Sequence, residues 1–289
     1  ISPEIFSVDL FGINIALRWY AVSYILGFVC ALRLMKIFIL KRHLWTSENP
    51  VLSTDQAESF LTYLILGVII GGRLGYVLFY NFEYYASSPL SIFRIWDGGM
   101  AFHGGFIGVI VAVVLFCRAN KLLLWSTADL IAVSTPPGLF FGRVANFINA
   151  ELWGRPTEVY WGVIFPGDMA QKCDGVIGPC ARHPSQLYEA GLEGLLLLIV
   201  LMYIAFKGGF KRPGFLTGVF ALGYGASRFF IEYFRVPDPQ FFSQSNPNGF
   251  AFQLGDYGIT MGQSLSIPMI LVGVLLCMRG AGHKENKQP

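Results

Sequence analysis

Charged residues are scarce in this chain. Only 13% of its 289 residues are Asp, Glu, Lys or Arg, whereas about 25% is usual for a soluble globular domain. The net charge of +3 is small and its positive residues are scattered, so nothing indicates a nucleic-acid partner. The five cysteines form no Cys-x-x-Cys pattern, and His-x-x-Glu-His is missing too, so the sequence predicts no metal site. No Ser/Pro/Gly tract or charge block marks a second, soluble domain.

Apolar residues are abundant instead. They make up 54% of the chain, and the mean hydropathy is +0.54. Apolar runs of roughly 20 residues, the length that crosses a bilayer, recur along the sequence. We therefore predict an all-α integral membrane protein that forms one domain over residues 1–289, with seven transmembrane helices. The predicted spans are residues 17–38, 58–80, 104–118, 125–146, 186–206, 214–234 and 261–279. The third is short, so we expect it to begin before His103.

The distribution of basic residues predicts the orientation of these spans, because short cytoplasmic loops are enriched in Lys and Arg. One set of loops holds Lys36, Lys41, Arg42, Arg118, Lys121, Lys207, Lys211, Arg212, Arg279, Lys284 and Lys287. The opposite set holds only Arg94, Arg155, Lys172, Arg182 and Arg235. The amino terminus is then outside and the carboxyl terminus cytoplasmic. Head elements on the outer side are expected at about 81–103, 147–185 and 235–260, and the first span is expected to be retained rather than cleaved as a signal peptide.

Two further patterns concern structure. Cys173 and Cys180 share one outer loop, and their spacing permits a disulfide if that compartment is oxidising. Small-xxx-small pairs, which let membrane helices approach closely, occur at Gly71 with Gly75, Gly104 with Gly108, Gly138 with Gly142, and Gly214 with Gly218. These pairs predict a tightly packed helix bundle.

Arginines inside the apolar spans point to function. An Arg near the bilayer centre costs about 2.5–3.5 kcal/mol on insertion scales, so each requires a partner or a task. They are Arg18, Arg33, Arg73, Arg143 and Arg228.

A helical segment around Arg143 would place Asn146, and less closely Asn149, on the same face. Just upstream, Pro136 and Pro137 must interrupt the fourth span. Broken membrane helices are tolerated where they line a polar cavity, so we expect a polar pocket near the outer face. The alternative is an arginine that snorkels and is capped by asparagines.

Arg228, Glu232 and Arg235 are spaced to share one face of the sixth span. A self-contained ladder of ion pairs would explain them without a function. Two arginine-bearing faces on the same membrane side favour an anion site, since a guanidinium grips phosphate through two hydrogen bonds.

Three residues have competing interpretations. His103 lies between glycines, where it is either a satisfied loop residue or, beside an arginine-lined cavity, a group that exchanges a proton near neutral pH. Tyr20 follows Trp19 at the outer interface and, alone, is typical of an aromatic anchor. Ser185 is expected to cap a helix amino terminus rather than act as a nucleophile, because no Gly-x-Ser-x-Gly motif accompanies it.

Several stretches resemble the bacterial phosphatidylglycerol–prolipoprotein diacylglyceryl transferases, and the likeness extends from Trp19-Tyr20 to Met261-Gly262-Gln263. They are Gly71 to Val77, Trp96 to Met100 with His103-Gly104-Gly105, Gly142 to Arg155, Arg182 to Glu189, and Gly223-Tyr224-Gly225 with Arg228. The segment from Arg143 to Arg155 is close to a family signature. The loop between Arg155 and His183 is the part that does not align with the family.

The resemblance implies a seven-span enzyme of the bacterial inner membrane whose amino terminus and active site face the periplasm. Such enzymes move a diacylglyceryl group from phosphatidylglycerol to the lipobox cysteine of a prolipoprotein signal peptide, release glycerol phosphate and need no metal or cofactor. This is the first step of lipoprotein lipidation. The family's important positions correspond here to Tyr20, His103, Arg143, Asn146, Glu151, Gly154, Arg228, Glu232 and Arg235.

The chemistry suggests a role for each group. We expect His103 to take the cysteine proton and Arg143 with Arg228 to hold the phosphate. Tyr20 and Asn146 would orient the headgroup and Glu232 would fix an arginine, while Glu151, Gly154 and Arg235 would belong to the substrate-binding set. The competing functions are a transporter or channel for an anionic or lipid substrate, and a lipid-binding scaffold. A transporter predicts charged groups that serve both membrane sides, whereas the arginines and His103 here all fall toward the outside.

Overall fold

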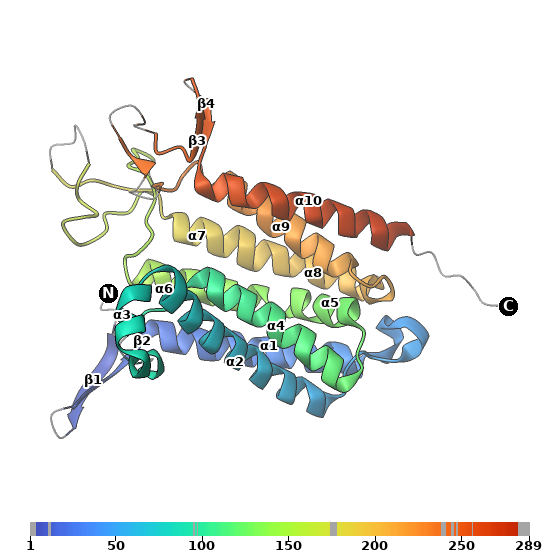
Figure 1. Ribbon diagram of the computed structural model, residues 1–289. Helices are drawn as coiled ribbons and strands as arrows, with labels where there is room; N and C mark the ends of the chain where they lie inside the picture. The colour runs from blue at the N-terminus through green and yellow to red at the C-terminus, as the bar shows by residue number, and fades with distance from the viewer. Residues whose placement is uncertain are drawn as a thin grey trace. The chain divides into compact units, whose positions relative to one another are not determined.

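A computed structural model describes residues 4–10, 13–94, 96, 98–173, 178–237, 241–243, 246, 248–255 and 257–282 (Figure 1). Asp97, which belongs to one family-like stretch, and the basic residues Lys284 and Lys287 lie outside the described residues. The chain divides into two compact units. One comprises residues 1–31 and 131–289, and the other residues 32–130.

The unit of residues 32–130 is built around α2 (Thr54–Phe79) and α4 (Phe102–Asn120). These two helices pack closely because glycines face each other. A Cβ added at Gly71 would lie 2.4 Å from the carbonyl oxygen of Gly104, and one added at Gly75 would lie 2.7 Å from the Gly104 Cα. Ser53 and Gln56 form a capping box that starts α2. The predicted close packing of the first two glycine pairs is thus confirmed.

Shorter elements complete this unit. They are α3 (Phe82–Ser87), the 3₁₀ turns η1 (Arg42–Leu44), η2 (Thr46–Glu48) and η3 (Pro89–Phe93), the second half of α1 (Trp19–Leu40) and most of α5 (Leu124–Ser134).

Arg73 has a structural task in this unit. Its buried guanidinium donates hydrogen bonds to the backbone carbonyls of Ser91 and Ile92, at 2.8 Å each, of Arg94 at 2.9 Å, and of Gly98 and Gly99. The η3 turn and the chain after it are therefore tied to α2. Arg33 is exposed, and Arg18 pairs with Glu4 at the surface, 3.5 Å away. Only Arg143 and Arg228, of the five arginines considered above, are left for a functional role.

The unit of residues 1–31 and 131–289 holds the remaining helices. They are the first half of α1, α6 (Pro136–Ile148), α7 (Ser185–Glu189), a π-helical turn η5 (Ala190–Leu196), α8 (Leu197–Phe206), a short turn η6 (Gly209–Lys211), α9 (Phe215–Ile231) and α10 (Met261–Gly282). Figure 1 shows α10 running along α9, and α7, η5 and α8 forming one continuous rod. α6 packs on η5 and α7. Leu201, Leu216 and Ile231 are fully buried in this unit.

Two short antiparallel hairpins were not predicted. β1 (Glu4–Leu10) pairs with β2 (Ile13–Arg18), and β3 (Phe252–Leu254) pairs with β4 (Tyr257–Ile259). The second hairpin leads directly into α10. The protein is therefore mostly, rather than entirely, helical.

Five helices are long and apolar enough to cross a membrane among the described residues: Trp19–Leu40, Thr54–Phe79, His103–Asn120, Ser185–Phe206 and Met261–Gly280. They correspond to the first, second, third, fifth and seventh predicted spans, and α4 does begin before His103. The sixth is a shorter apolar helix, Phe215–Ile231. The fourth is divided, as its prolines predicted, into α5 ending at Ser134 and α6 beginning at Pro136. Seven crossings stay a prediction.

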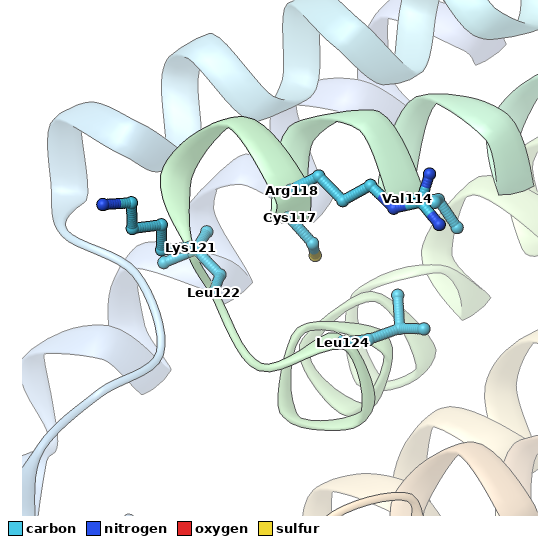
Figure 2. A pocket seen from close by; sticks show the side chains of 6 residues that line it. All are labelled: Val114, Cys117, Arg118, Lys121, Leu122 and Leu124. Carbon is cyan, nitrogen blue, oxygen red and sulfur yellow. The ribbon is translucent and has the colours of Figure 1, made fainter.

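A small hollow of about 320 Å³ lies at the carboxyl end of α4 (Figure 2). Val114, Cys117, Leu122 and Leu124 provide apolar walls, and Arg118 and Lys121 extend beside them. Lys121 ends α4 in the left-handed conformation, with φ 55°. The walls are mostly apolar and the two cations are exposed, so this hollow lacks the fixed polar groups of a reaction site.

Candidate active site

Glu189 is the centre of a buried network of charges. Its carboxylate lies at the end of α7 with no exposed surface, and three arginines approach it. Arg228 Nη1 lies 2.7 Å and Arg235 Nη1 2.9 Å from Oε1, while Arg143 Nη1 lies 3.2 Å from Oε2. These arginines come from α6, α9 and the turn after α9. One carboxylate therefore gathers guanidiniums that are distant in sequence.

A second buried carboxylate holds Arg143 from the other side. Glu193 lies one helical turn after Glu189, and its Oε2 accepts a hydrogen bond of 3.3 Å from Arg143 Nη2. Glu193 belongs to the π-helical turn η5, a wide turn that is often found at functional sites. Arg143 is thus fixed by two carboxylates, and only 20% of its side chain is exposed.

Glu232 completes the network. Its Oε2 lies 3.0 Å from Arg228 Nη2 and 3.6 Å from Arg235 Nε. The ladder of ion pairs considered from the sequence is therefore real, but it is not self-contained, because both arginines also pair with Glu189. The three arginines and three glutamates carry formal charges that cancel when all are ionised.

Tyr20 joins a polar chain in the same unit. Its hydroxyl donates a hydrogen bond of 2.5 Å to Glu151 Oε2 and accepts one from the side-chain amide of Asn146. Asn146 lies on α6, one turn after Arg143. Tyr20 is therefore more than an interfacial anchor, since its phenol is oriented by two polar side chains.

The backbone around Glu151 is strained. Ala150 and Leu152 adopt positive φ angles of 55° and 56°, which side chains with a Cβ rarely occupy. Gln186 Nε2 donates to the Glu151 carbonyl at 2.5 Å, and Ser185 Oγ donates to the Leu152 carbonyl at 3.0 Å. Strained backbone held by surrounding contacts is typical of functional sites. The expectation that Ser185 caps the next helix was wrong, because its hydroxyl holds this turn instead.

Gly154 lies where three backbone segments meet. Its N–H donates to the His183 carbonyl at 2.9 Å, and a Cβ at this position would lie 2.5 Å from the Phe234 carbonyl oxygen. Arg155 continues this junction, since its Nε donates to the Arg235 carbonyl at 2.8 Å. No larger residue fits at 154 without moving backbone, so Gly154 serves assembly of the site.

A cross-linked loop follows this junction. Cys173 and Cys180 form a disulfide, which settles the alternatives that the spacing left open. The buried Arg182 donates to the carbonyls of Ala170 at 2.6 Å and Lys172 at 2.8 Å, and its guanidinium lies 4.2 Å from the Trp153 ring centre. Burial lowers the pKa of Arg182. The described residues before the disulfide are therefore packed around Arg182.

His103 belongs to the other compact unit. It lies in the first turn of α4, and its side chain is exposed. Another histidine, His183, belongs to the same unit as the charge network. Its Nδ1 lies 3.1 Å from the Tyr188 hydroxyl, and burial lowers its pKa.

Sequence reasoning missed Glu189 and Glu193 as site residues, although Glu189 ends one of the family-like stretches. Both fall at the start of a strongly apolar helix, where a carboxylate is as costly as an arginine. Counting intramembrane acids together with the arginines would have revealed both.

The fold and this network define a class: a mostly helical membrane protein with a buried, multiply paired arginine cluster and a cross-linked polar loop beside it. Comparison with known families identifies the class further. The profile of the prolipoprotein diacylglyceryl transferase family matches residues 8–279, and the chain belongs to that family.

Named relatives agree with this assignment. A phosphatidylglycerol–prolipoprotein diacylglyceryl transferase of Cereibacter sphaeroides is 55% identical over 280 residues, which cover 96% of each chain. The enzyme of the same name from Ruegeria pomeroyi is 54% identical over 96% of this chain and 95% of its own length. That of Brucella anthropi is 44% identical over 95% and 90%, respectively.

Proposed function

We propose that this protein transfers the diacylglyceryl group of phosphatidylglycerol to the thiol of the lipobox cysteine in a prolipoprotein. The observation that carries this proposal is the convergence of Arg143, Arg228 and Arg235 on Glu189 in a chain of this family. A phosphate that leaves within a low-dielectric site requires fixed cationic donors, and guanidiniums held by carboxylates are fixed before the substrate arrives.

The reaction balances as a substitution at carbon. The thiol gives its proton to a base, and the thiolate sulfur forms a bond to the glyceryl carbon that bears the phosphate ester. The bond between that carbon and oxygen breaks, and its electron pair leaves with glycerol phosphate. The products are a thioether and a phosphomonoester, and no redox step occurs.

Arg143 and Arg228 are proposed to hold the phosphate. Each uses its two terminal nitrogens toward carboxylates, Arg143 toward Glu189 and Glu193, and Arg228 toward Glu189 and Glu232. A terminal guanidinium nitrogen carries two hydrogens, so each retains a hydrogen for an incoming oxygen. About one fifth of each side chain is exposed, which leaves access for a headgroup.

Tyr20 and Asn146 are proposed to orient the lipid. Glu151 accepts the phenol hydrogen of Tyr20, which leaves the lone pairs of the hydroxyl toward Asn146 and a substrate. Gly154 and Arg235 complete the site through backbone contacts and through Glu189, as described above.

His103 is proposed as the base. An unperturbed thiol has a pKa near 8.5, so only a few per cent is thiolate at pH 7. A neutral imidazole has one ring nitrogen with a free lone pair, which can accept this proton. The proposal rests on this chemistry and on the likeness of the Trp96-to-Gly105 stretch to the family.

The membrane arrangement is also proposed. Seven crossings of one domain are proposed from the apolar runs, and an outer amino terminus with a cytoplasmic carboxyl terminus from the distribution of basic residues. The disulfide between Cys173 and Cys180 supports a loop in an oxidising compartment. We therefore propose that the loop and the site face the periplasmic side of the bacterial inner membrane.

The function is tested by incubating detergent-purified protein with phosphatidylglycerol and a lipobox peptide, then weighing the peptide. We expect the peptide to gain the mass of one diacylglyceryl group. Folded protein that produces no such gain would favour the scaffold or the transporter instead.

A further inference from the structure

A cavity of about 380 Å³ adjoins the charge network but is separate from the arginine cluster itself. It lies between the carboxyl end of α9, the β3–β4 hairpin and the start of α10. Phe250 and Tyr257 supply aromatic walls. Arg155, Glu232, Asn248 and Gln263 supply polar groups. A cavity that combines aromatic walls with convergent polar groups suits a small polar ligand.

Glu232 is shared by this cavity and the network. Both of its arginine contacts involve Oε2, so Oε1 is the oxygen left to accept a hydrogen bond from a ligand. The carboxylate is fixed against α10 because residue 262 is glycine. A Cβ at Gly262 would lie 2.5 Å from Oε2.

The opposite groups of the cavity are hydrogen-bond donors. Gln263 uses its side-chain oxygen to accept from the Thr260 N–H at 3.1 Å, which leaves its Nε2 as a donor. Arg155 uses Nε toward the Arg235 carbonyl and retains its two terminal nitrogens. Burial lowers the pKa of Arg155, and the negative charge of Glu232 opposes this shift. The cavity thus presents one strong acceptor and at least two donors.

We propose that this cavity binds the terminal glycerol of the phosphatidylglycerol headgroup. Its hydroxyls donate to Glu232 and accept from Arg155 and Gln263. The inference rests on the proposed function, in which Arg228 holds the phosphate. Because Glu232 contacts Arg228 and also lines the cavity, the phosphate and glycerol subsites are neighbours, as the two ends of one headgroup must be.

This arrangement also selects between headgroups. A hydroxyl both donates and accepts, so glycerol satisfies Glu232 and the donors opposite it together. The ammonium of an ethanolamine headgroup only donates, so Arg155 and Gln263 would stay unpaired and Arg155 would repel it. Unpaired polar groups in a site reject an analogue more strongly than a missing apolar contact does.

The test uses glycerol phosphate and inorganic phosphate as soluble probes, with binding measured by titration calorimetry on the full-length protein in detergent. We expect the wild type to bind glycerol phosphate about tenfold more tightly than inorganic phosphate, the effect of hydrogen bonds that include a charged partner. In Gln263→Glu this ratio should fall to about one, since the carboxylate preserves the cap on Thr260 but removes the Nε2 donor. Gln253→Glu is the matched control, because it adds the same charge on exposed strand β3, outside the cavity lining, and should leave the ratio unchanged.

Equal binding of the two probes to the wild type would overturn the proposal, as would a ratio that Gln263→Glu leaves intact. If Gln263→Glu raised the KM for the lipobox peptide and left the binding of both probes unchanged, the cavity would instead be assigned to the peptide. These measurements need no turnover, so they are distinct from the mass assay, whose failure would refute the transferase function itself. Turnover gives a further test with a phosphatidylpropanol lipid, which lacks the headgroup hydroxyls. The wild type should transfer from this lipid about tenfold more slowly than from phosphatidylglycerol, whereas Gln263→Glu should use the two lipids at similar rates.

Discussion

Arg228 Nη1 lies 2.7 Å from Oε1 of Glu189, across 39 residues of sequence and between two different helices. The carboxylate has no exposed surface, so the pair is formed away from water. Breaking one member of a buried pair leaves an uncompensated charge, which is far more costly than losing a surface pair.

Glu189→Gln should therefore destabilise the protein by about 3–5 kcal/mol, because three arginines lose their shared counter-charge. The matched control is Glu58→Gln, which removes the surface pair with Lys36 and should change stability by less than about 0.5 kcal/mol. Thermal unfolding in one detergent measures both. Equal shifts for the two variants would show that Glu189 does not hold the network together.

Arg143→Lys keeps the positive charge but cannot bridge Glu189 and Glu193 with two nitrogens of one plane. We expect kcat/KM to fall by about 100-fold, because the lysine ammonium would not hold the phosphate in the orientation that the reaction requires. Arg33→Lys, on an exposed position of α1, serves as control and should stay within twofold. Unchanged transfer by Arg143→Lys would argue against a forked grip on the phosphate.

His103→Gln tests the proposed base. General-base catalysis contributes about 10²–10⁴-fold, so turnover should fall by that factor. The exposed His43, changed to Gln, is the control. Near-full activity of His103→Gln across neutral pH would show that His103 is not the base. The thiol would then have to ionise because the nearby arginines lower its pKa.

Gly71→Ala should separate α2 from α4. The added Cβ would meet the Gly104 carbonyl oxygen at 2.4 Å, and such overpacking costs about 1–3 kcal/mol. Gly142→Ala places the same methyl group where no atom of the described residues lies within 4 Å, so it should cause no loss. Denaturant or thermal unfolding compares the two. A harmless Gly71→Ala would mean that these helices are held apart by other side chains.

Replacing Cys173 and Cys180 together with serine should weaken the cross-linked loop by about 2 kcal/mol, from the closure of a loop with sequence separation 7. Limited proteolysis near Arg182 measures this effect. The same cysteines test orientation. After reduction of intact spheroplasts, a membrane-impermeant maleimide should label them, whereas labelling only after lysis would place the loop in the cytoplasm.

Much of the fold was predictable because the bilayer imposes a length on each apolar run. The break between α5 and α6 followed from Pro136, whose ring removes a backbone donor. The hairpins β1–β2 and β3–β4 were missed because strands this short leave little periodicity to detect. The close approach predicted at Gly138 and Gly142 is confirmed at Gly138 alone. A Cβ added at Gly27 of α1 would lie 3.0 Å from the Gly138 Cα, whereas a Cβ at Gly142 would meet none of the described atoms within 4 Å.

The site was predictable in its arginines and not in their partners. Arg143 and Arg228 were conspicuous in apolar context, but spacing along one helix reveals only neighbours on that helix. Glu189 joins three segments, and that relation exists only after α6, α7 and α9 pack. Arg73 is also a buried arginine in an apolar helix, but its hydrogen bonds go to backbone carbonyls rather than to carboxylates, so its role is structural.

The π-helical turn at Ala190–Leu196 makes the geometry of the site depend on the number of residues in this segment. Such a turn amounts to one additional residue within an α-helix, and each residue of an α-helix turns its successors by about 100°. Deleting one residue here would let the turn become regular α-helix. Because the wide turn absorbs its extra residue, Leu197–Phe206 would keep nearly the same orientation, whereas residues inside the turn, Glu193 among them, would change direction. A deletion in this segment should thus disturb the pair of Glu193 with Arg143 more than the packing of Leu197–Phe206.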